Sequence, residues 1–233
     1  MKNSERYLIA FNQIDKYLNN ELSRNGSYVG FSQAVNKVAQ HNHIVKRFKD
    51  DLLEFAVLRN AIVHERTDPE YVIAEPHDST VEKIEKVLSE LTEPKKVIPT
   101  FSQEVKSFKI SDSLADVLNM IKYTHYSQFP VYEEDEFKGL LTANGITNWL
   151  AETVDEDLLS REETTLDQLI DYEEGTENYK FVSRDLTIYE AEDIFKDQVN
   201  KEDRIDAVLI THNGKSDESL LGIISAWDII DIP

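Results

Sequence analysis

The sequence predicts an α+β protein of 233 residues, with an all-α helical bundle in residues 1–96 followed by two copies of a βαββα unit in residues 97–233. Three observations support this prediction. Apolar residues recur every three or four positions up to about residue 92, which is typical of amphipathic helices. Beyond residue 97, short apolar strands alternate with helical stripes, and this order occurs twice. The net charge is −1 in residues 1–96 and −19 in residues 97–233, which indicates two units with different roles.

The N-terminal bundle should consist of amphipathic helices joined by polar turns. The turn Asn25-Gly26 ends the first helix, and a polar stretch over residues 65–80 precedes the last one. Pro94 and Pro99 interrupt the helical pattern where the charge balance changes, so we place the domain boundary after residue 96. The expected helices cover about residues 5–23, 31–39, 44–63 and 81–91.

The C-terminal part repeats one order of strand, helix, strand, strand and helix. The helical stripe that begins at Leu114 recurs 74 residues later, at Ile188. Neither copy can cover its own sheet, so the copies, about residues 97–152 and 153–233, should pack into one pseudo-twofold module. The later strands and closing helices are expected at 129–132, 139–142 and 146–150 in the first copy, and at 207–210, 222–225 and 227–230 in the second.

Composition excludes several classes of protein. The chain has no cysteine, which rules out disulfides, thiolate metal sites and cysteine nucleophiles. No zinc-spaced His/Glu set is present, so no metal site is expected, and seven glycines argue against a phosphate-binding P-loop. No apolar run reaches the ~18 residues of a membrane span, and no apolar signal core follows Met1. We therefore expect a cytoplasmic protein without membrane contact.

The second copy contains the run Gly222-Ile223-Ile224-Ser225, followed by Asp228. This order of glycine, two apolar residues, serine or threonine, two further residues and aspartate resembles the tandem cystathionine-β-synthase (CBS) domain pair, as does the repeat layout. The resemblance implies that an adenine nucleotide binds as a regulatory ligand in a cleft between the repeats, with no other cofactor required. AMP, ADP, ATP and cyclic di-AMP all agree with the pattern.

Ser225 and Asp228 have side chains suited to a nucleotide. A hydroxyl and free backbone N–H groups bind phosphate oxygens, and a carboxylate accepts hydrogen bonds from both ribose hydroxyls. The resemblance assigns the phosphate contact to Ser225, the ribose contact to Asp228, and the adenine wall to Val182, Ala207 and Val208. The alternative is that Ser225 caps the final helix and Asp228 favours its dipole, with no ligand.

The first copy departs from this pattern. It has Thr142 at the serine position, but Gly145 stands where the ribose-binding carboxylate is expected. We therefore expect a weak or inactive first site and one nucleotide for each CBS pair.

Arg59, Asn60 and His64 interrupt the apolar stripe of the helix expected over residues 44–63. At 100° per residue, Arg59 falls within the apolar face, where burying its charge alone is costly. This arginine must therefore be paired or lie in a seam between two subunits. The face that surrounds it, which we expect to support a homodimer, contains Leu52, Phe55, Ile62 and Val63.

The same three residues resemble the motif of HEPN domains, all-α bundles that often dimerise and in many members cleave RNA. The resemblance implies that His64 transfers protons, Arg59 holds the phosphate and Asn60 orients them. The alternative is a catalytically silent bundle that dimerises or binds a protein partner. RNA could approach only the N-terminal unit, since the acidic C-terminal unit repels polyanions.

Taken together, these patterns predict a cytoplasmic regulatory protein. Its CBS pair binds an adenine nucleotide and signals to the helical module, and we expect no enzymatic activity. The first alternative is a nucleotide-regulated, metal-independent ribonuclease. The second is a CBS pair that serves as a ligand-free dimerisation platform.

Overall fold

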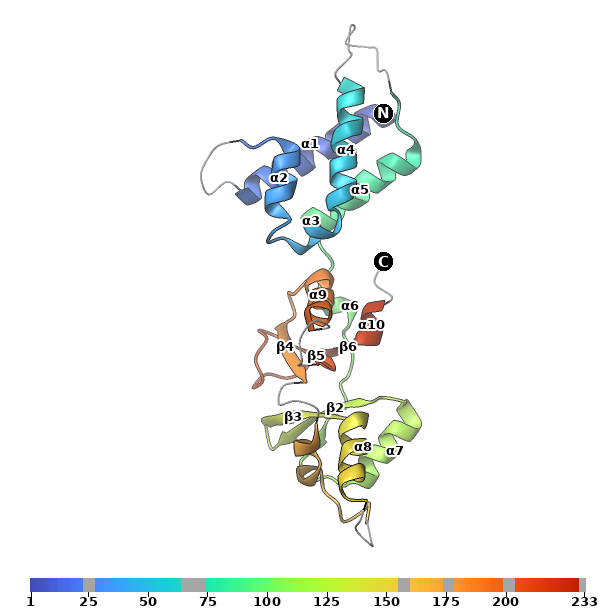
Figure 1. Ribbon diagram of the computed structural model, residues 1–233, viewed down its shortest axis with the longest axis vertical. Helices are drawn as coiled ribbons and strands as arrows, with labels where there is room; N and C mark the ends of the chain where they lie inside the picture. Colours follow the sequence, from blue (N-terminus) through green and yellow to red (C-terminus); the bar gives the residue numbers. More distant parts are fainter. Residues whose placement is uncertain (23–27, 64–73, 155–159, 174–177, 199–203, 231–233) are drawn as a thin grey trace. The chain divides into compact units, whose positions relative to one another are not determined.

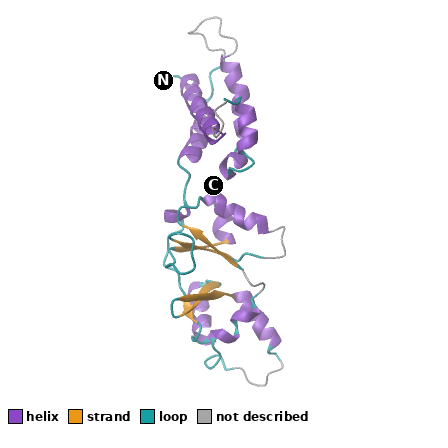
Figure 2. Ribbon diagram, turned by 90° about the vertical axis from the view of Figure 1, so that its left-hand side faces the viewer, coloured by secondary structure: helices purple, strands orange, loops and turns teal. Residues whose placement is uncertain are grey.

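The computed structural model describes residues 1–22, 28–63, 74–154, 160–173, 178–198 and 204–230. The chain divides into two compact units, residues 1–95 and 96–233. In Figures 1 and 2, the described part of the first unit contains helices and no strands, whereas the second unit contains every strand drawn. The predicted α+β class is therefore confirmed. Within the described ranges, no helix combines the length and the apolar character needed to cross a bilayer.

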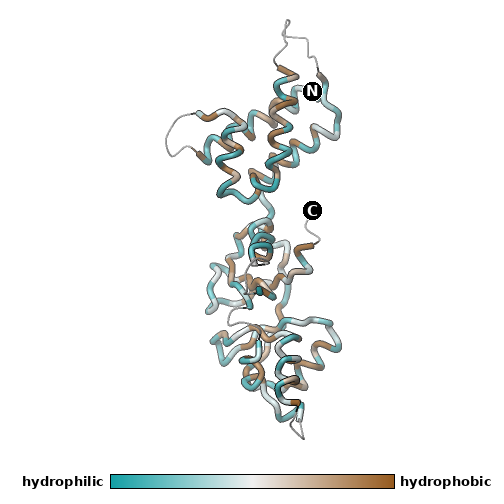
Figure 3. The backbone as a smooth tube through the Cα atoms, in the orientation of Figure 1, coloured by the Kyte–Doolittle hydropathy of each residue, from teal (hydrophilic) through white to brown (hydrophobic). Residues whose placement is uncertain are grey.

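The first unit is built around α1, which packs against α2, α4 and α5. Brown apolar positions alternate with teal polar ones along these helices in Figure 3, as expected for amphipathic helices with one buried side. The core side chains come from all the helices, so the unit has one apolar centre. The helices are α1 (Asn3–Leu22), α2 (Phe31–Val38), α3 (His43–Arg47), α4 (Lys49–Val63) and α5 (Asp78–Thr92).

The single helix expected over residues 44–63 is wrong, because the chain breaks at Phe48. Its backbone angles, φ −94° and ψ 16°, leave the helical region between α3 and α4. The Asn42 side chain caps α3 by accepting hydrogen bonds from the backbone N–H groups of Ile44 and Val45. Both of those residues are buried, so the apolar pattern continues across the break and conceals it.

The apolar face of α4 packs inside the first unit. Leu52, Phe55 and Ile62 are 0, 4 and 1% exposed, and Val63 is half-buried. The expectation that this face forms a homodimer seam is therefore wrong for these side chains, because helices of the same chain already cover it.

Tyr7 anchors α1 to α4 and gives a test of this packing. It is fully buried, its hydroxyl donates a 2.9 Å hydrogen bond to the Phe55 carbonyl, and burial raises the pKa of the phenol. Tyr7→Phe should lower the free energy of unfolding by about 1–2 kcal/mol, since the buried carbonyl loses this donor. Denaturant unfolding followed by far-UV circular dichroism measures the loss. Tyr28→Phe is the control, because Tyr28 is 72% exposed, and an equal loss in both variants would contradict the prediction.

The second unit contains the predicted βαββα order twice. In each copy, the first strand pairs parallel to the second, and the second pairs antiparallel to the third. The first copy comprises β1 (Phe108–Lys109), α7 (Leu114–Thr124), β2 (Gln128–Glu133), β3 (Glu136–Thr142) and α8 (Ala143–Glu152). The second comprises β4 (Tyr179–Ser183), α9 (Ile188–Gln198), β5 (Ala207–Thr211), β6 (Gly222–Ser225) and α10 (Ala226–Ile230).

Each sheet of the second unit is covered on both faces. On one face, the helices of the same copy pack against the sheet and form a separate apolar core. On the other, the two copies meet in a shared cluster that includes Leu140, Leu209 and Ile223. Aromatic rings at the edge of this cluster, those of Phe137, Tyr179 and Phe181, pack edge to face. Joining the copies therefore buries the sheet faces that neither could cover alone.

Two connecting segments cross between the copies. The segment with α6 (Val97–Thr100) joins the second copy, where the Val97 N–H donates to the Leu186 carbonyl at 2.8 Å. The 3₁₀ helices η1 (Leu166–Gln168) and η2 (Ile170–Tyr172) join the first copy, where the Leu166 N–H donates to the Asp112 carbonyl at 3.1 Å. Each copy therefore packs against a segment that the division expected near residue 152 assigns to the other copy. Residues 97–100 contact the second copy, and residues 166–172 contact the first.

Candidate functional site

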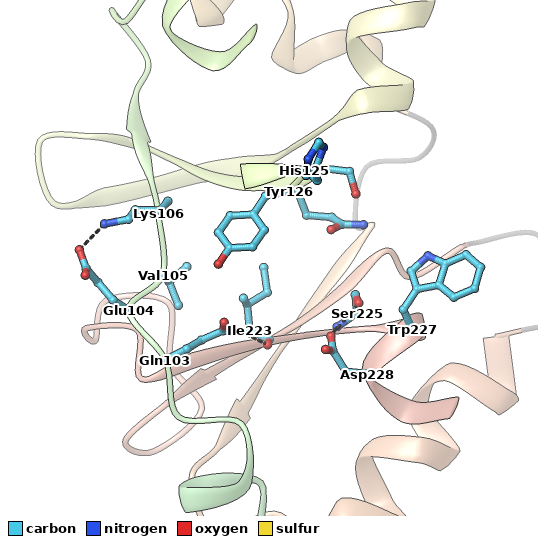
Figure 4. A pocket seen from close by; sticks show the side chains of 12 residues that line it. Gln103, Glu104, Val105, Lys106, His125, Tyr126, Ile223, Ser225, Trp227 and Asp228 are labelled. Carbon is cyan, nitrogen blue, oxygen red and sulfur yellow. Dashed lines mark hydrogen bonds and ion pairs between the residues drawn. The ribbon is translucent and has the colours of Figure 1, made fainter. Parts of the chain in front are cut away.

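A cavity of about 200 Å³ lies between the two copies of the second unit. Three segments line it: residues 103–106 before β1, residues 125–128 from the end of α7 to the first residue of β2, and residues of the β6–α10 junction. Figure 4 shows the first-copy side chains on one side and Ile223, Ser225 and Asp228 on the other. Both copies therefore supply the walls.

The segment 103–106 is held against β6 by its backbone and by one side chain. The Gln103 N–H donates to the Leu221 carbonyl at 3.2 Å, and its Nε2 donates to the Ile223 carbonyl at 2.9 Å. The Phe101 carbonyl approaches Gly222 so closely that a Cβ there would lie 2.2 Å from its oxygen. Gly222 therefore permits the close approach that brings Glu104 and Lys106 to the cavity.

Ser225 and Asp228 meet at the start of α10. The N–H and the Oγ of Ser225 each donate a 2.7 Å hydrogen bond to Oδ2 of Asp228. This contact differs from the ligand-free alternative, in which the Ser225 hydroxyl accepts from the helix, because here Ser225 donates; it uses only one carboxylate oxygen. Oδ1 of Asp228 has no partner among the described residues, and the side chain is exposed at the cavity. The pair can therefore cap the helix and still offer an acceptor to a ligand.

Aromatic and cationic side chains complete the wall opposite Asp228. The Tyr126 ring extends into the cavity and is 48% exposed, while Trp227 is 78% exposed at its rim (Figure 4). Lys106 lines the cavity and pairs with Glu104, and His125 ends α7 in a left-handed conformation with φ 60°. Sequence reasoning missed Tyr126 and Lys106, because nothing local marks them as neighbours of β6.

The three residues expected to form the adenine wall do not line this cavity. Val182, Ala207 and Val208 are 5, 0 and 0% exposed, and none of them lines the cavity. Val182 and Val208 face the helices of their own copy, while Ala207 lies in the cluster shared by both copies. Their strands, β4 and β5, pair side by side, and these three side chains belong to the apolar cores.

The first-copy counterparts of Ser225 and Asp228 are buried. Thr142 is 4% exposed, and its Oγ1 accepts a 3.0 Å hydrogen bond from the N–H of Gly145, itself buried. The N–H and Oγ1 of Thr142 donate to Glu173, a residue that sequence reasoning did not consider. Neither Thr142 nor Gly145 lines the cavity.

Arg59 and Asn60 interact within one chain. The Arg59 side chain donates a 3.3 Å hydrogen bond to Oδ1 of Asn60, and its guanidinium carbon lies 5.9 Å from the centroid of the Phe11 ring. The guanidinium therefore has contacts within its own chain, while its Nε is buried without a hydrogen-bond partner among the described residues. His64 lies outside the described residues, so the HEPN-like resemblance stays a prediction. No group of three or more candidate metal ligands occurs in the described part of the chain.

Several solved structures are similar to part of this chain. A search of curated proteins finds no match. Solved structures with similarity include the CBS domains of a transcriptional regulator from Streptococcus pneumoniae, with 17% identity, a TM-score of 0.41, and coverage of 59% of this chain and 98% of that one. The CBS domain of a membrane protein from Sphaerobacter thermophilus has 10% identity and a TM-score of 0.46, with coverage of 65% and 96%. CBSX2 in complex with AMP has 13% identity and a TM-score of 0.43, with coverage of 58% and 93%.

The CBS domain family model matches residues 98–152 and 169–233, one range in each βαββα copy. These ranges include both the cavity walls and the Ser225–Asp228 pair. Because they make up more than half of the 233 residues, the chain belongs to the CBS domain family and carries a tandem CBS pair.

Proposed function

We propose that the cavity of the second unit binds an adenine nucleotide and that its occupancy regulates the helical unit. The observation that carries the proposal is Oδ1 of Asp228, which has no partner in the described part of the chain and is exposed at a cavity between the repeats of a CBS pair. Fixed by its two bonds from Ser225, the carboxylate is held in one orientation before any ligand arrives. Such preorganisation reduces the ordering cost of binding.

Each part of a nucleotide has a chemically suited partner. Ribose hydroxyls donate to the Asp228 carboxylate, and hydrogen bonds to a charged acceptor are stronger than neutral ones. The exposed ring of Tyr126 offers a stacking surface for the base. Lys106 is the cation for the phosphate. Its pairing with Glu104 is solvent-exposed and stabilises the protein little, so exchanging that partner for a phosphate costs little.

Charge and size favour a nucleoside monophosphate. Among the described residues that line the cavity, Lys106 is the only lysine or arginine, whereas Glu104 and Asp228 are both acidic. Each further phosphate adds repulsion from residues 97–233, which carry a net charge of −19. The cavity volume of about 200 Å³ is also below the ~300–1,000 Å³ of typical ligand pockets. We therefore infer that AMP binds more tightly than ADP, ATP or cyclic di-AMP.

Isothermal titration calorimetry with the full chain tests this proposal. AMP should bind with a stoichiometry of one, followed by ADP and then ATP, with GMP and cyclic di-AMP weaker than AMP. Mass spectrometry of the purified protein reports any nucleotide retained during purification. Absence of adenine-nucleotide binding, or equal affinity for AMP and GMP, would refute the proposal.

Lys106 provides a second prediction. Lys106→Ala should weaken AMP binding by about 3- to 10-fold, because one exposed charge contact to the phosphate is lost, and should leave adenosine binding unchanged. Competition calorimetry with AMP and adenosine separates the two effects. Lys215→Ala, which removes an exposed lysine that does not line the cavity, is the matched control. An equal loss for adenosine would show that Lys106 does not act on the phosphate.

For the helical unit, we propose a partner-binding role without nuclease chemistry. The supporting observation is that Arg59 is already engaged by Asn60 and by the Phe11 ring. Structured RNA incubated with the wild type and with His64→Ala, with and without AMP, should remain intact in both. Cleavage that requires His64 would overturn this role in favour of a ribonuclease.

A further inference from the structure

Two glutamates occupy equivalent places in the two halves of the CBS pair. The segments that cross between the copies enter through equivalent bridges, Lys96 to Thr187 and Thr165 to Ser113. Each segment then passes over the glycine of its sheet. A Cβ on Gly222 would lie 2.2 Å from the backbone oxygen of Phe101, and a Cβ on Gly139 would lie 3.0 Å from Cδ1 of the Ile170 side chain. Three residues further, each segment reaches a glutamate. The equivalent pairs are Val97 and Leu166, Phe101 and Ile170, and Glu104 and Glu173.

The two glutamates make different contacts. Glu173 Oε1 accepts a 2.6 Å bond from the Thr142 N–H, and its Oε2 accepts bonds from Thr142 Oγ1 at 2.7 Å and from Asn178 Nδ2 at 3.1 Å. Glu104 instead pairs with Lys106 at the edge of the open cavity. In the second copy, the equivalent bonds from Ser225 go to Asp228. In each copy, therefore, one carboxylate accepts hydrogen bonds from the serine or threonine. In the second copy this carboxylate belongs to Asp228, three residues after Ser225, and in the first copy it belongs to Glu173 of the connecting segment.

Gly145 makes room for the Glu173 carboxylate. A Cβ on Gly145 would lie 1.9 Å from Oε1 of Glu173 and 2.4 Å from its carboxyl carbon. A side chain at 145 and Glu173 in this position therefore exclude each other. Asn178, 3% exposed, donates to both Glu173 and the Leu140 carbonyl and so ties the carboxylate to β3.

We propose that Glu173 is a built-in occupant of the Thr142 end of the first cleft, which excludes a nucleotide there and leaves one nucleotide site per chain. A cavity of about 300 Å³ remains beside Glu173, between Gly139 and Tyr179, but Thr142 and Gly145 do not line it. This inference rests on the proposed function for its ligand, but the closure itself rests on geometry. Both carboxylate oxygens of Glu173 are engaged, whereas Asp228 keeps Oδ1 free. Thr142 and Gly145 are buried, whereas Ser225 is half-buried and Asp228 is exposed.

A thermal double-mutant cycle tests the closure without any ligand. Gly145→Ala should lower the Tm of the second unit by roughly 5 °C, because its Cβ displaces the carboxylate of Glu173. In a Glu173→Ala background, the same change should shift the Tm by no more than about 1 °C, since the obstructing group is gone. Equal shifts in both backgrounds would overturn the proposed exclusion.

The number of AMP molecules bound per chain tests whether Glu173 blocks a second site. Glu173→Ala combined with Gly145→Asp recreates in the first copy the pattern of Ser225 and Asp228, and should bind one AMP more per chain than the wild type in calorimetry. Asp217→Ala, which removes an exposed carboxylate that lines neither cavity, should leave the stoichiometry unchanged. A folded double variant with wild-type stoichiometry, or a wild type that binds two AMP, would overturn the inference. If the wild type binds none and the double variant binds one, the closure stands and the proposed function of the second cleft fails.

Discussion

Asp228→Ala should weaken AMP binding by about 5- to 150-fold, the equivalent of about 1–3 kcal/mol. The substitution removes the only carboxylate that the described residues place at the Ser225 end of the cavity, and so takes a charged acceptor from the ribose hydroxyls. It also releases the Ser225 N–H and hydroxyl, so a preorganised acceptor is lost together with its supporting contact. Calorimetry with AMP measures the change in affinity, and fluorescence of the neighbouring Trp227 reports whether the junction stays folded.

Two further variants separate the role of Asp228 in binding from its capping role. Asp217→Ala removes an exposed aspartate that does not line the cavity, and should leave AMP affinity unchanged. Asp228→Asn keeps an oxygen that can accept from Ser225 but removes the charge, so its affinity should lie between those of the wild type and Asp228→Ala. Unchanged AMP binding in Asp228→Ala would sink the assignment of the ribose contact.

Gly222→Ala should destabilise the second unit by about 2–4 kcal/mol. A Cβ at this position would lie 2.2 Å from the carbonyl oxygen of Phe101, and a backbone atom cannot rotate away as a side-chain end can. Relief of the clash must lift the segment that carries Gln103, Glu104 and Lys106, so AMP binding should weaken as well. Denaturant unfolding followed by tryptophan fluorescence isolates this unit, because both tryptophans, Trp149 and Trp227, belong to it.

Gly30→Ala is the matched control for the glycine substitution. Nothing lies within 4 Å of a Cβ at Gly30, and its φ of −59° suits any residue. The variant should change stability by less than about 1 kcal/mol and leave AMP binding intact. A Gly222→Ala protein as stable as Gly30→Ala would show that the segment over β6 is not held as closely as the structure indicates.

The sequence alone determined those features of this protein that depend on neighbouring residues. Apolar periodicity located the amphipathic helices, and the recurrence of one order of elements identified the CBS pair. The run from Gly222 to Asp228 placed serine and aspartate together because they lie three residues apart at a strand–helix junction, where their contact is local. The lack of a carboxylate at Gly145 could be predicted in the same way, because position 145 lies three residues after Thr142.

Only the tertiary structure decided what each buried face packs against and which distant groups meet. Periodicity reports that a face is buried but not its partner, so the α4 face around Phe55 suggested a dimer seam. The resemblance to CBS pairs suggested Val208 for the ligand wall, but the fold places this side chain in the core of its own copy. Glu173 follows Gly145 by 28 residues, and its contact with Thr142 depends on the crossing of η1 and η2 onto the first copy. Such a contact leaves no local pattern, because hydrogen bonds between remote segments are specified by the packing of the whole unit.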